Sequence, residues 1–596
     1  MSNNGLELSK KGLKGPFFIF VLLLIVACNS TKPQTFEESI DQLQEHYSTR
    51  LFTISSIIAE LSESTSTEEQ QQLYLQARSL YKQIEPILQY DSDANYKFLN
   101  GPNILRVEEE DLTNIKELEV TGLQLIEELV YDNGNIEDIQ YHAKLTSDRF
   151  RLIAENTDFR FIKAHHILWM IRDGILRVGI TGITPFDSPV LGAELVESQD
   201  YLNGLSHIIS HFEFAFTSKE LYENWKLAIN KAQNELNEKP FDAYSFIKDD
   251  QQQLLRIWLQ TVKDWQVSFP LELAVSNNAQ SLFDQQTFNM AYFAKRKTPD
   301  SIKSIALLGK KLFSETRLSS TNSVSCASCH LPENYFTDGK RVAFDGTRNT
   351  PSLYYSGYQQ AFFYDNRSGS LEGQIVSVIN NENEFHSSVE MYAENLESNE
   401  FYVNSFKTLF ESEINDNHIR DAIAAYIRTL NPFNSKFDRN MRGEEVTLTS
   451  SEINGFNLFM GKGQCATCHF LPLFNGTVPT KFAESEMELI GVPATNDTID
   501  VSIDPDLGRY YVFNTEKRKY FFKTPTIRNI EMTAPYMHNG VYQTLEEVVD
   551  FYNRGGGQGM GIELPYQTLP PEPLELTDKE QKDLVAFMKS LTDERP

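Results

Sequence analysis

The stretch SVSCASCHLP, residues 323–332, contains a C-x-x-C-H motif formed by Cys326, Cys329 and His330. The motif returns 139 positions later in QCATCHFLP, residues 464–472, as Cys465, Cys468 and His469. The chain has five cysteines, so four of them lie in the two motifs. Two thiols separated by two residues and followed at once by histidine are typical of covalent haem attachment. Each cysteine adds to one vinyl group, and the histidine ligates the iron.

Zinc binding and thiol redox chemistry are two other uses of a C-x-x-C motif. A four-thiolate zinc site would employ the cysteines but would leave both adjacent histidines without a role. A thioredoxin-like redox pair would require a βαβ pattern around the motif, and neither copy has one. We therefore expect two covalently bound c-type haems.

Length and charge narrow the class of protein. A chain of 596 residues is too long for one hydrophobic core and predicts several domains. Its 83 acidic and 54 basic residues give a net charge of −29, which disfavours nucleic acid and anionic lipid as partners. The same charge would attract a basic protein.

The first 28 residues have the layout of an export signal. Three lysines precede the apolar run PFFIFVLLLIVAC, which ends at Cys28. A small residue just before this cysteine resembles the bacterial lipoprotein box, and the alternative is a signal peptide with a chance cysteine. We expect a lipid anchor at Cys28 and a soluble body in the periplasm or cell envelope, with the membrane touched only through the anchor. No cysteine is then left for a disulfide.

The predicted fold is mainly α. Residues 33–280 show apolar residues at three- and four-residue spacing and predict an N-terminal helical bundle of unknown role. The motifs then fall in two successive segments, 285–445 and 446–596, which predict two cytochrome c-like haem domains. Thr449 or Ser450 is expected to cap the helix before the second motif. A last helix should bury one face formed by Leu584, Phe587, Met588 and Leu591.

Residues 285–596 resemble the bacterial di-haem cytochrome c peroxidases. The resemblance lies in four blocks of sequence: LGKKLFSETRLSSTNSVSCASCH, GTRNTPSLYYSG, AFFYDNRSGSLEGQ and FKTPTIRNIEMTAPYMHNGVYQTLEEVV. It implies that the first haem cleaves hydrogen peroxide. It also implies that the second haem passes in electrons from a small cytochrome c or cupredoxin.

The resemblance also implies site residues. Glu384 stands where the family has its distal acid and Gln374 where it has a distal amide, although Glu382 nearby shows that a solvated charge is the simpler reading. Tyr364 stands at the position of a tryptophan between the haems, and no tryptophan follows Trp265. A tyrosine can relay an electron, but its oxidation is coupled to loss of a proton.

Both iron sites depart from the usual pattern of the family. No histidine occurs between His330 and His386, so the resemblance implies a five-coordinate first haem at rest. Tyr552 takes the position of the methionine that usually ligates the second haem, as in the tyrosine-ligated, MauG-like branch. Thr533 and Tyr552 are 19 positions apart, which is the family spacing. Met537 is the alternative ligand.

A calcium ion between the haems is also implied by the resemblance. Its ligands would be the side chain of Asn349 and the backbone oxygens of Thr533 and Pro535, which are suitable hard donors. A weaker candidate lies in the N-terminal part, where His207, His211 and Glu213 are predicted to share a helical face. Histidines in such a pattern are more often packed residues than metal ligands.

The sequence thus favours a di-haem peroxidase that reduces hydrogen peroxide. One alternative is an oxidase that modifies a side chain of a partner protein, as in the tyrosine-ligated branch. Another is a non-enzymatic electron carrier of the cell envelope, which would need neither an open haem face nor Glu384.

Overall fold

The computed structural model describes residues 35–108, 115–132, 134–295, 301–343 and 346–595, and it is mainly α-helical, as predicted. The expected export segment and Cys28 lie outside these residues. Within the described ranges no helix is both long and apolar enough to cross a membrane.

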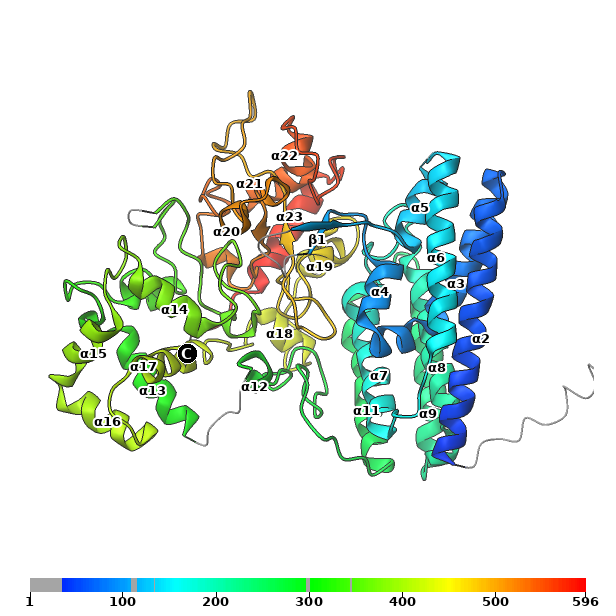
Figure 1. Cartoon of the computed structure of the whole chain (residues 1–596), viewed down its shortest axis with the longest axis horizontal. Helices are drawn as coiled ribbons and strands as arrows, with labels where there is room; N and C mark the ends of the chain where they lie inside the picture. Colours follow the sequence, from blue (N-terminus) through cyan, green and yellow to red (C-terminus); the bar gives the residue numbers. More distant parts are fainter. Residues whose placement is uncertain (1–34, 109–114, 133, 296–300, 344–345, 596) are drawn as a thin grey trace, which may run out of the picture.

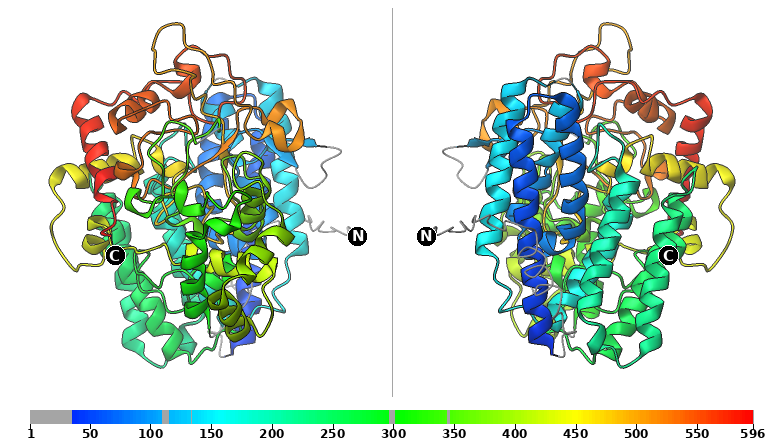
Figure 2. Two further views of the ribbon diagram at one scale, coloured as in Figure 1. Left: turned by 90° about the vertical axis from the view of Figure 1, so that its left-hand side faces the viewer. Right: turned by 90° about the vertical axis from the view of Figure 1, so that its right-hand side faces the viewer.

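The N-terminal part is a stack of helices that run side by side (Figures 1 and 2). Its long helices are α2 (Phe36–Glu63), α3 (Thr67–Asp91), α6 (Ile136–Asn156), α7 (Ala164–Arg177), α8 (Glu194–His211), α9 (Lys219–Glu235) and α11 (Gln252–Asp264). Shorter elements are α4 (Asp93–Asn100), α5 (Leu123–Tyr131), α10 (Ala243–Ser245), the π-helical turns η1 (Val178–Gly182) and η3 (Phe246–Gln251), and the 3-10 turn η2 (Glu213–Ala215). Strands β1 (Arg106–Glu108) and β2 (Lys116–Leu118) form an antiparallel pair.

The start and packing of α2 illustrate why these sequences are helical. Thr35 and Glu38 form a reciprocal capping box that satisfies free backbone donors at the first turn. Leu43, Tyr47 and Leu51 follow at four-residue spacing and are completely buried. This apolar stripe packs against α3 and α6.

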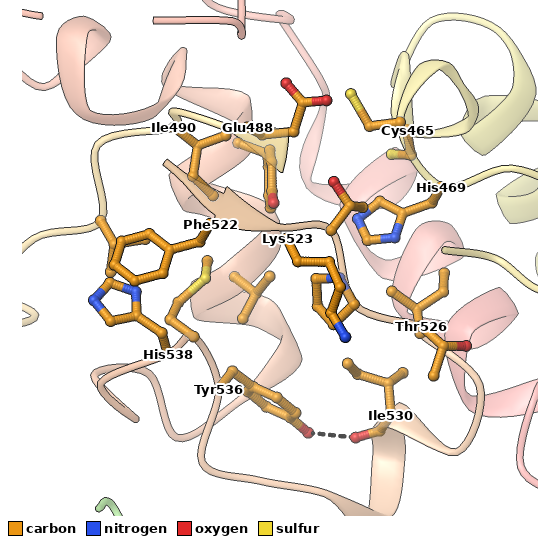
Figure 3. A pocket seen from close by; sticks show the side chains of 18 of the residues that line it. Cys465, His469, Glu488, Ile490, Phe522, Lys523, Thr526, Ile530, Tyr536 and His538 are labelled. Atoms are coloured by element: carbon orange, nitrogen blue, oxygen red, sulfur yellow. Dashed lines mark hydrogen bonds between the residues drawn. The ribbon is translucent and has the colours of Figure 1, made fainter. Parts of the chain in front are cut away.

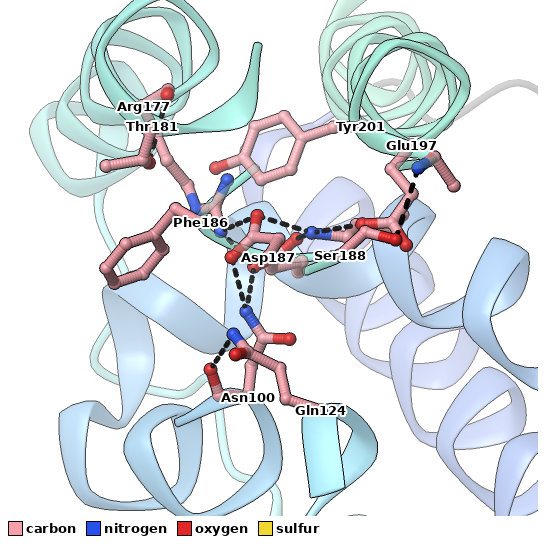
Figure 4. A network of polar contacts seen from close by, with 12 residues as sticks. Asn100, Gln124, Arg177, Thr181, Phe186, Asp187, Ser188, Glu197 and Tyr201 are labelled. Atoms are coloured by element: carbon pink, nitrogen blue, oxygen red, sulfur yellow. Dashed lines mark hydrogen bonds and ion pairs between the residues drawn. The ribbon is translucent and has the colours of Figure 1, made fainter. Parts of the chain in front are cut away.

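A network of buried charged side chains joins helices of the bundle (Figure 4). The Nε atom of Arg78 lies 2.7 Å from Oε1 of Glu197, and Nζ of Lys82 lies 2.7 Å from Oδ2 of Asp187. Nη2 of Arg177 lies 2.8 Å from Oε1 of Glu85. Three cations thus face three carboxylates. These pairs connect α3 to α7 and to α8, and removing one partner would leave a costly unpaired charge in the interior.

The bundle packs directly on the second C-x-x-C-H motif. Turn η1, which follows Arg177, contacts the motif turn η8 (Cys465–Thr467). The ring of Phe186 meets the edge of the Phe470 ring at a centroid distance of 5.9 Å. The backbone N–H of Tyr244 donates to Oδ1 of Asn457, at a distance of 3.0 Å. The N-terminal helices therefore form part of the surroundings of the second motif.

The remainder of the chain contains shorter helices and long irregular connections. Around the first motif these are α12 (Met290–Phe293), α13 (Ile302–Phe313), α14 (Leu371–Asn380), α15 (Val389–Glu397), α16 (Glu400–Phe410), α17 (Asp416–Ile427), α18 (Lys436–Met441) and 3-10 turns η4 (Thr316–Leu318), η5 (Cys326–Ser328), η6 (Pro332–Asn334) and η7 (Ser356–Tyr358). Around the second they are α19 (Ser450–Met460), α20 (Tyr510–Phe513), α21 (Leu545–Asn553), α22 (Gly556–Gly559), α23 (Asp578–Ser590), η8, η9 (Glu516–Arg518) and η10 (Ile530–Met532). Strands β3 (Met487–Glu488) and β4 (Phe522–Lys523) pair antiparallel, with Met487 opposite Lys523.

The same helix crossing occurs once beside each motif. Helix α13 crosses α17, and helix α19 crosses α23. A glycine lies at each crossing: a Cβ atom added to Gly309 would meet the carbonyl oxygen of Ala422 at 1.8 Å, and one added to Gly455 would meet that of Asp583 at 1.9 Å. Only glycine permits such close approach of two backbones. The crossing is the structural repeat that accompanies the sequence repeat.

Two local predictions for the second segment are confirmed. Thr449 caps α19 through a capping box with Glu452. The predicted face of the last helix is buried, and its four residues are Leu584, Phe587, Met588 and Leu591. The boundaries proposed at 280–285 and 445–446 remain predictions.

Candidate haem sites

Each C-x-x-C-H motif folds into one 3-10 turn with the same hydrogen bonds. The backbone N–H groups of Cys329 and His330 donate to the carbonyl of Cys326, at distances of 3.3 and 2.9 Å. In the second motif, the N–H groups of Cys468 and His469 donate to the carbonyl of Cys465 at 3.3 and 3.0 Å. The backbone hydrogen bonds therefore hold the two cysteines and the histidine in the same arrangement in both motifs.

The imidazoles are oriented by equivalent carbonyl groups. Nδ1 of His330 lies 3.0 Å from the carbonyl oxygen of Phe336, and Nδ1 of His469 lies 3.2 Å from that of Phe474. Since a carbonyl only accepts, Nδ1 carries the proton in each case and Nε2 is left with a lone pair for a metal. Phe336 and Phe474 both have positive φ values, 61° and 50°, so a strained backbone places each acceptor.

Burial keeps both histidines neutral, which is the form that ligates iron. It lowers the pKa of His469 to about 4 and also lowers the pKa of His330, although backbone carbonyls oppose the shift. Burial likewise raises the pKa of Cys326 and of Cys465 to about 12, as expected for thiols in apolar surroundings.

The four cysteines of the motifs form no disulfide. Within the described ranges no three His, Cys, Asp or Glu side chains gather as a metal site would require.

A second repeat, missed in the sequence, supports each histidine. The segments Thr350-Pro351-Ser352-Leu353 and Thr524-Pro525-Thr526-Ile527 share the pattern T-P-[ST]-[LI]. The backbone carbonyl of Pro351 acts on His330, and that of Pro525 acts on His469, each favouring the protonated ring. The common T-P pattern was the signal that could have revealed this pair.

A cavity of about 290 Å³ opens beside the second motif (Figure 3). Cys465, Cys468 and His469 line it, and Tyr552 on α21 and Met537 line it as well. This volume is close to the lower end for cofactor pockets, and its walls are mostly apolar with a few convergent polar groups. Burial raises the pKa of Tyr552 well above its ordinary value. The residues present therefore fit a haem held by His469, with two candidate ligands on the cavity wall.

Glu384 lies near the first motif, in the loop that follows α14. The backbone N–H of Ser320 donates to the carbonyl of Phe385 at 3.0 Å, which fastens this loop to the segment leading into the motif. Burial is the main cause of the raised pKa of Cys329, and the negative charges of Asp338 and Glu384 add to it. Glu384 therefore acts electrostatically on the motif.

The carboxylate of Glu384 has one direct partner. Nδ2 of Asn381 donates to its Oε1 at 2.8 Å. Although the residue is exposed overall, partial desolvation of the carboxylate raises the pKa of Glu384, and the bond from Asn381 opposes that shift. Gln374, on α14, lines the cavity described above.

Tyr364 and the predicted calcium ligands meet at the same cavity. The hydroxyl of Tyr364 donates to Oδ1 of Asn349 at 3.4 Å, and Nδ2 of Asn349 donates to the carbonyl of Pro535 at 3.2 Å. Thr533 lies two residues before Pro535, and all four residues line the cavity. The amide oxygen and the carbonyl groups are donors that calcium accepts. The sequence prediction thus selected residues that are neighbours in space.

The weaker metal prediction in the bundle was wrong in its third member. His207 and His211 do share a face of α8, with ring centroids 4.6 Å apart. Glu213 is exposed in turn η2, beyond the end of that helix. The ring that packs on His207 is instead that of His46 from α2, at a centroid distance of 3.9 Å, which the sequence spacing could not indicate.

Comparison with known proteins identifies the family. Residues 303–446 match the family model described as di-haem cytochrome c peroxidase. The cytochrome-c peroxidase IdrP2 of Denitromonas iodatirespirans is 33% identical over 306 residues, covering 48% of this chain and 81% of the relative. The chain belongs to the di-haem cytochrome c peroxidase family.

Other members of the family are similarly close. The methylamine utilization protein MauG of Methylorubrum extorquens is 34% identical over 301 residues, covering 49% of this chain and 78% of that protein. A crystal structure of a MauG-like protein associated with microbial copper homeostasis is 30% identical, covers 50% of this chain and 93% of that one, and has a TM-score of 0.44. Membership of this di-haem family implies two c-type haems. The matches cover about half of the chain.

Proposed function

We propose that this di-haem cytochrome c peroxidase reduces hydrogen peroxide to water with electrons from a small redox protein. The observation that carries the proposal is the repeated motif turn, in which a neutral histidine presents a free Nε2 beside two cysteines. The reaction consumes one peroxide, two electrons and two protons and yields two water molecules. Two molecules of a one-electron donor, a cytochrome c or a cupredoxin, therefore serve each turnover.

The motif residues hold the two cofactors. Cys326 and Cys329 bind the first haem covalently and His330 ligates its iron; the equivalent residues bind the second. The haems, when bound, supply the site of O–O cleavage and the storage of electrons. The first is the peroxidatic one, because Glu384 lies near its motif and no histidine between residues 330 and 386 can occupy its open face.

Glu384 moves the proton that O–O cleavage requires. The carboxylate of Glu384 would accept a proton from one oxygen of hydrogen peroxide and return it to the other as the O–O bond breaks. The raised pKa brings Glu384 closer to the pH at which it works. The family resemblance gives Gln374 the role of positioning the peroxide through its amide, and Gln374 lies on α14, which leads into the loop of Glu384. Asn381 positions Glu384 through its hydrogen bond.

Tyr364 would relay electrons between the haems when both are bound. It lines the cavity at the second motif, and its chain neighbours lead into α14 and the loop of Glu384. Burial raises the pKa of Tyr364 well above its ordinary value, so its hydroxyl is protonated at rest. Electron transfer through Tyr364 is therefore coupled to movement of that proton.

Tyr552 would supply the second protein ligand of this haem iron in addition to His469, and Met537, which lines the same cavity, is the competing ligand. A phenolate favours ferric iron, whereas a thioether favours ferrous iron, so tyrosine ligation gives the second haem a low reduction potential. This property keeps a second function open, the oxidation of a side chain of a partner protein. The similarity to MauG favours that alternative.

Asn349, Thr533 and Pro535 bind one calcium ion between the two haem units. The contact of Asn349 with the Pro535 carbonyl supports this assignment. The ion would join the first segment, 285–445, to the second, 446–596. We further propose that these segments are two cytochrome c-like domains behind a helical bundle at 33–280, as the repeated helix crossings suggest.

The protein acts in the periplasm or cell envelope and is lipid-anchored at Cys28. The apolar run before this cysteine and the haem motifs support export. A net charge of −29 favours a basic donor protein and disfavours nucleic acid.

Steady-state assays distinguish the three functions. A peroxidase oxidises a reduced small cytochrome continuously when peroxide is added. A side-chain oxidase instead consumes peroxide only with its partner protein, and an electron carrier reacts slowly with peroxide and is insensitive to Glu384→Gln. Absence of turnover with any reduced cytochrome or cupredoxin would contradict the proposed function.

A further inference from the structure

The two T-P repeats place Lys523 at the position equivalent to Asn349. Asn349 precedes Thr350-Pro351 in the first copy, and Lys523 precedes Thr524-Pro525 in the second. Both residues line the cavity, and both touch Tyr364, one through its hydroxyl and the other through its backbone carbonyl. A lysine in the second copy thus takes the place of the proposed calcium ligand.

Among the residues that the structure describes, no carboxylate is paired with Lys523. Its Nζ donates to Oε1 of Gln359, and its backbone N–H donates to the carbonyl of Tyr364 at 2.7 Å. The nearest acid in electrostatic terms, Asp365, is already paired with Arg348 at 2.8 Å and with Arg367 at 2.9 Å. Ion pairs among the described residues include none to Lys523.

Among the described residues, each other basic group on the cavity wall already has a partner or a role. Arg528 is completely buried and pairs with Asp438 at 2.8 Å, and His538 faces Asp504 at 3.2 Å. The imidazole of His469 serves the iron. Burial lowers the pKa of Lys523 to about 8, as expected for an ammonium that meets only an amide. An ammonium in a largely apolar cavity is costly unless an anion joins it.

We propose that Lys523 binds a propionate carboxylate of the second haem. The proposal rests on the haem assignment made above and adds a recognition residue to it. The cavity that Lys523 lines also contains Cys465, Cys468 and His469, so the covalent attachment holds the porphyrin within the same walls. A haem would bring two propionate carboxylates into this cavity, and Lys523 supplies a cation that can pair with one of them.

The pair has a consequence for the second iron. A positive charge held beside a propionate reduces the negative field at the iron and favours the ferrous state. The Tyr552 phenolate acts in the opposite direction. Lys523 therefore raises the reduction potential of the second haem, so that a cytochrome donor can still reduce it.

The test compares Lys523→Met, Lys523→Arg and the control Lys589→Met in the full chain with both haems. Lys589 is an exposed residue on α23 of the same segment, so its replacement changes net charge equally. The midpoint potential of the second haem is measured by spectroelectrochemistry, and propionate bending modes are measured by resonance Raman spectroscopy. Haem content is determined separately, by absorbance of the denatured protein.

Lys523→Met should lower the equilibrium constant for reduction of the second haem at least tenfold, which is about 59 mV for one electron. Lys523→Arg should stay within threefold of wild type but shift the propionate mode. Equal potentials in Lys523→Met and Lys589→Met would overturn the proposal. If Lys523→Met does not fold, an unchanged propionate mode in Lys523→Arg would overturn it. Absence of the second haem from wild-type protein would instead refute the haem assignment.

Discussion

Replacement of Glu384 by glutamine should slow the reaction with peroxide by about 10²–10⁴-fold. The change keeps the size of the side chain and leaves an acceptor for Asn381, whose Nδ2 lies 2.8 Å from the carboxylate. It removes only the ability to take up and release a proton, which is typically worth that factor. At 1.36 kcal/mol per tenfold step, the expected rise in activation free energy is about 3–5 kcal/mol.

The assay is stopped-flow mixing of the ferric protein with peroxide across a range of pH. Because the carboxylate form accepts the proton, the rate should fall as pH drops through the raised pKa of Glu384. Asn381→Ala removes a hydrogen bond that favours the charged form, so it should move this limb to higher pH. Glu384→Gln should abolish the limb.

The matched control is Glu382→Gln, because Glu382 is an exposed acid two residues away on the same loop. It should change the rate by less than twofold, and both variants should retain two haems. A loss below threefold in Glu384→Gln, or an acid limb that survives in it, would refute the role of Glu384 as the proton carrier.

Three further predictions concern the second haem, the helix crossing and the bundle. Tyr552→Phe should abolish the low-spin electron paramagnetic resonance signal of the second haem, whereas Met537→Leu should preserve it; the reverse result would make Met537 the ligand. Gly309→Ala should lower the free energy of unfolding by about 1–3 kcal/mol in urea, because its Cβ would meet a backbone oxygen at 1.8 Å, whereas Gly369→Ala, with nothing within 4 Å, should not. Burial lowers the pKa of His207 from 6.5 to about 4 in the folded bundle, so on acidification the unfolded chain binds the proton before the folded one does. The free energy of unfolding should therefore decrease as the pH is lowered from 6.5 to about 4. His207→Leu should weaken that dependence, and an unaltered pH profile would contradict the packing assigned to the ring.

Much of the site was predictable because its chemistry is local in sequence. Each C-x-x-C-H motif places its three functional side chains within five residues, and the repeat of the motif, together with the cysteine count, predicted two haem sites. The cap at Thr449 and the buried face of α23 were likewise predictable from short-range spacing. Such features depend on neighbours within one helical turn.

The remainder depends on contacts between distant segments. The acceptors for the two imidazoles are carbonyls of Phe336 and Phe474, and any residue has a carbonyl, so composition gives no signal. The partner of His207 comes from another helix, 161 positions earlier, at His46. The packing of turn η1 on the second motif is equally long-range, and no periodicity in the bundle sequence indicates it.

The ionic network of the bundle shows a second limit. Arg78, Lys82 and Arg177 carry full charges, so composition alone would place them on the surface, yet all three are buried. Their burial becomes favourable only because carboxylates of other helices meet them. Tertiary structure thus overrides the local preference of charged residues for solvent.

The central claim is tested most directly by the stoichiometry of turnover. Holoprotein containing two haems is mixed with a known amount of hydrogen peroxide and an excess of a reduced basic cytochrome c, whose oxidation is followed by absorbance. The account predicts two cytochromes oxidised for each peroxide consumed, with catalysis lost in Glu384→Gln but retained in Glu382→Gln. Peroxide consumption without oxidation of the cytochrome, or oxidation unaffected by Glu384→Gln, would contradict it.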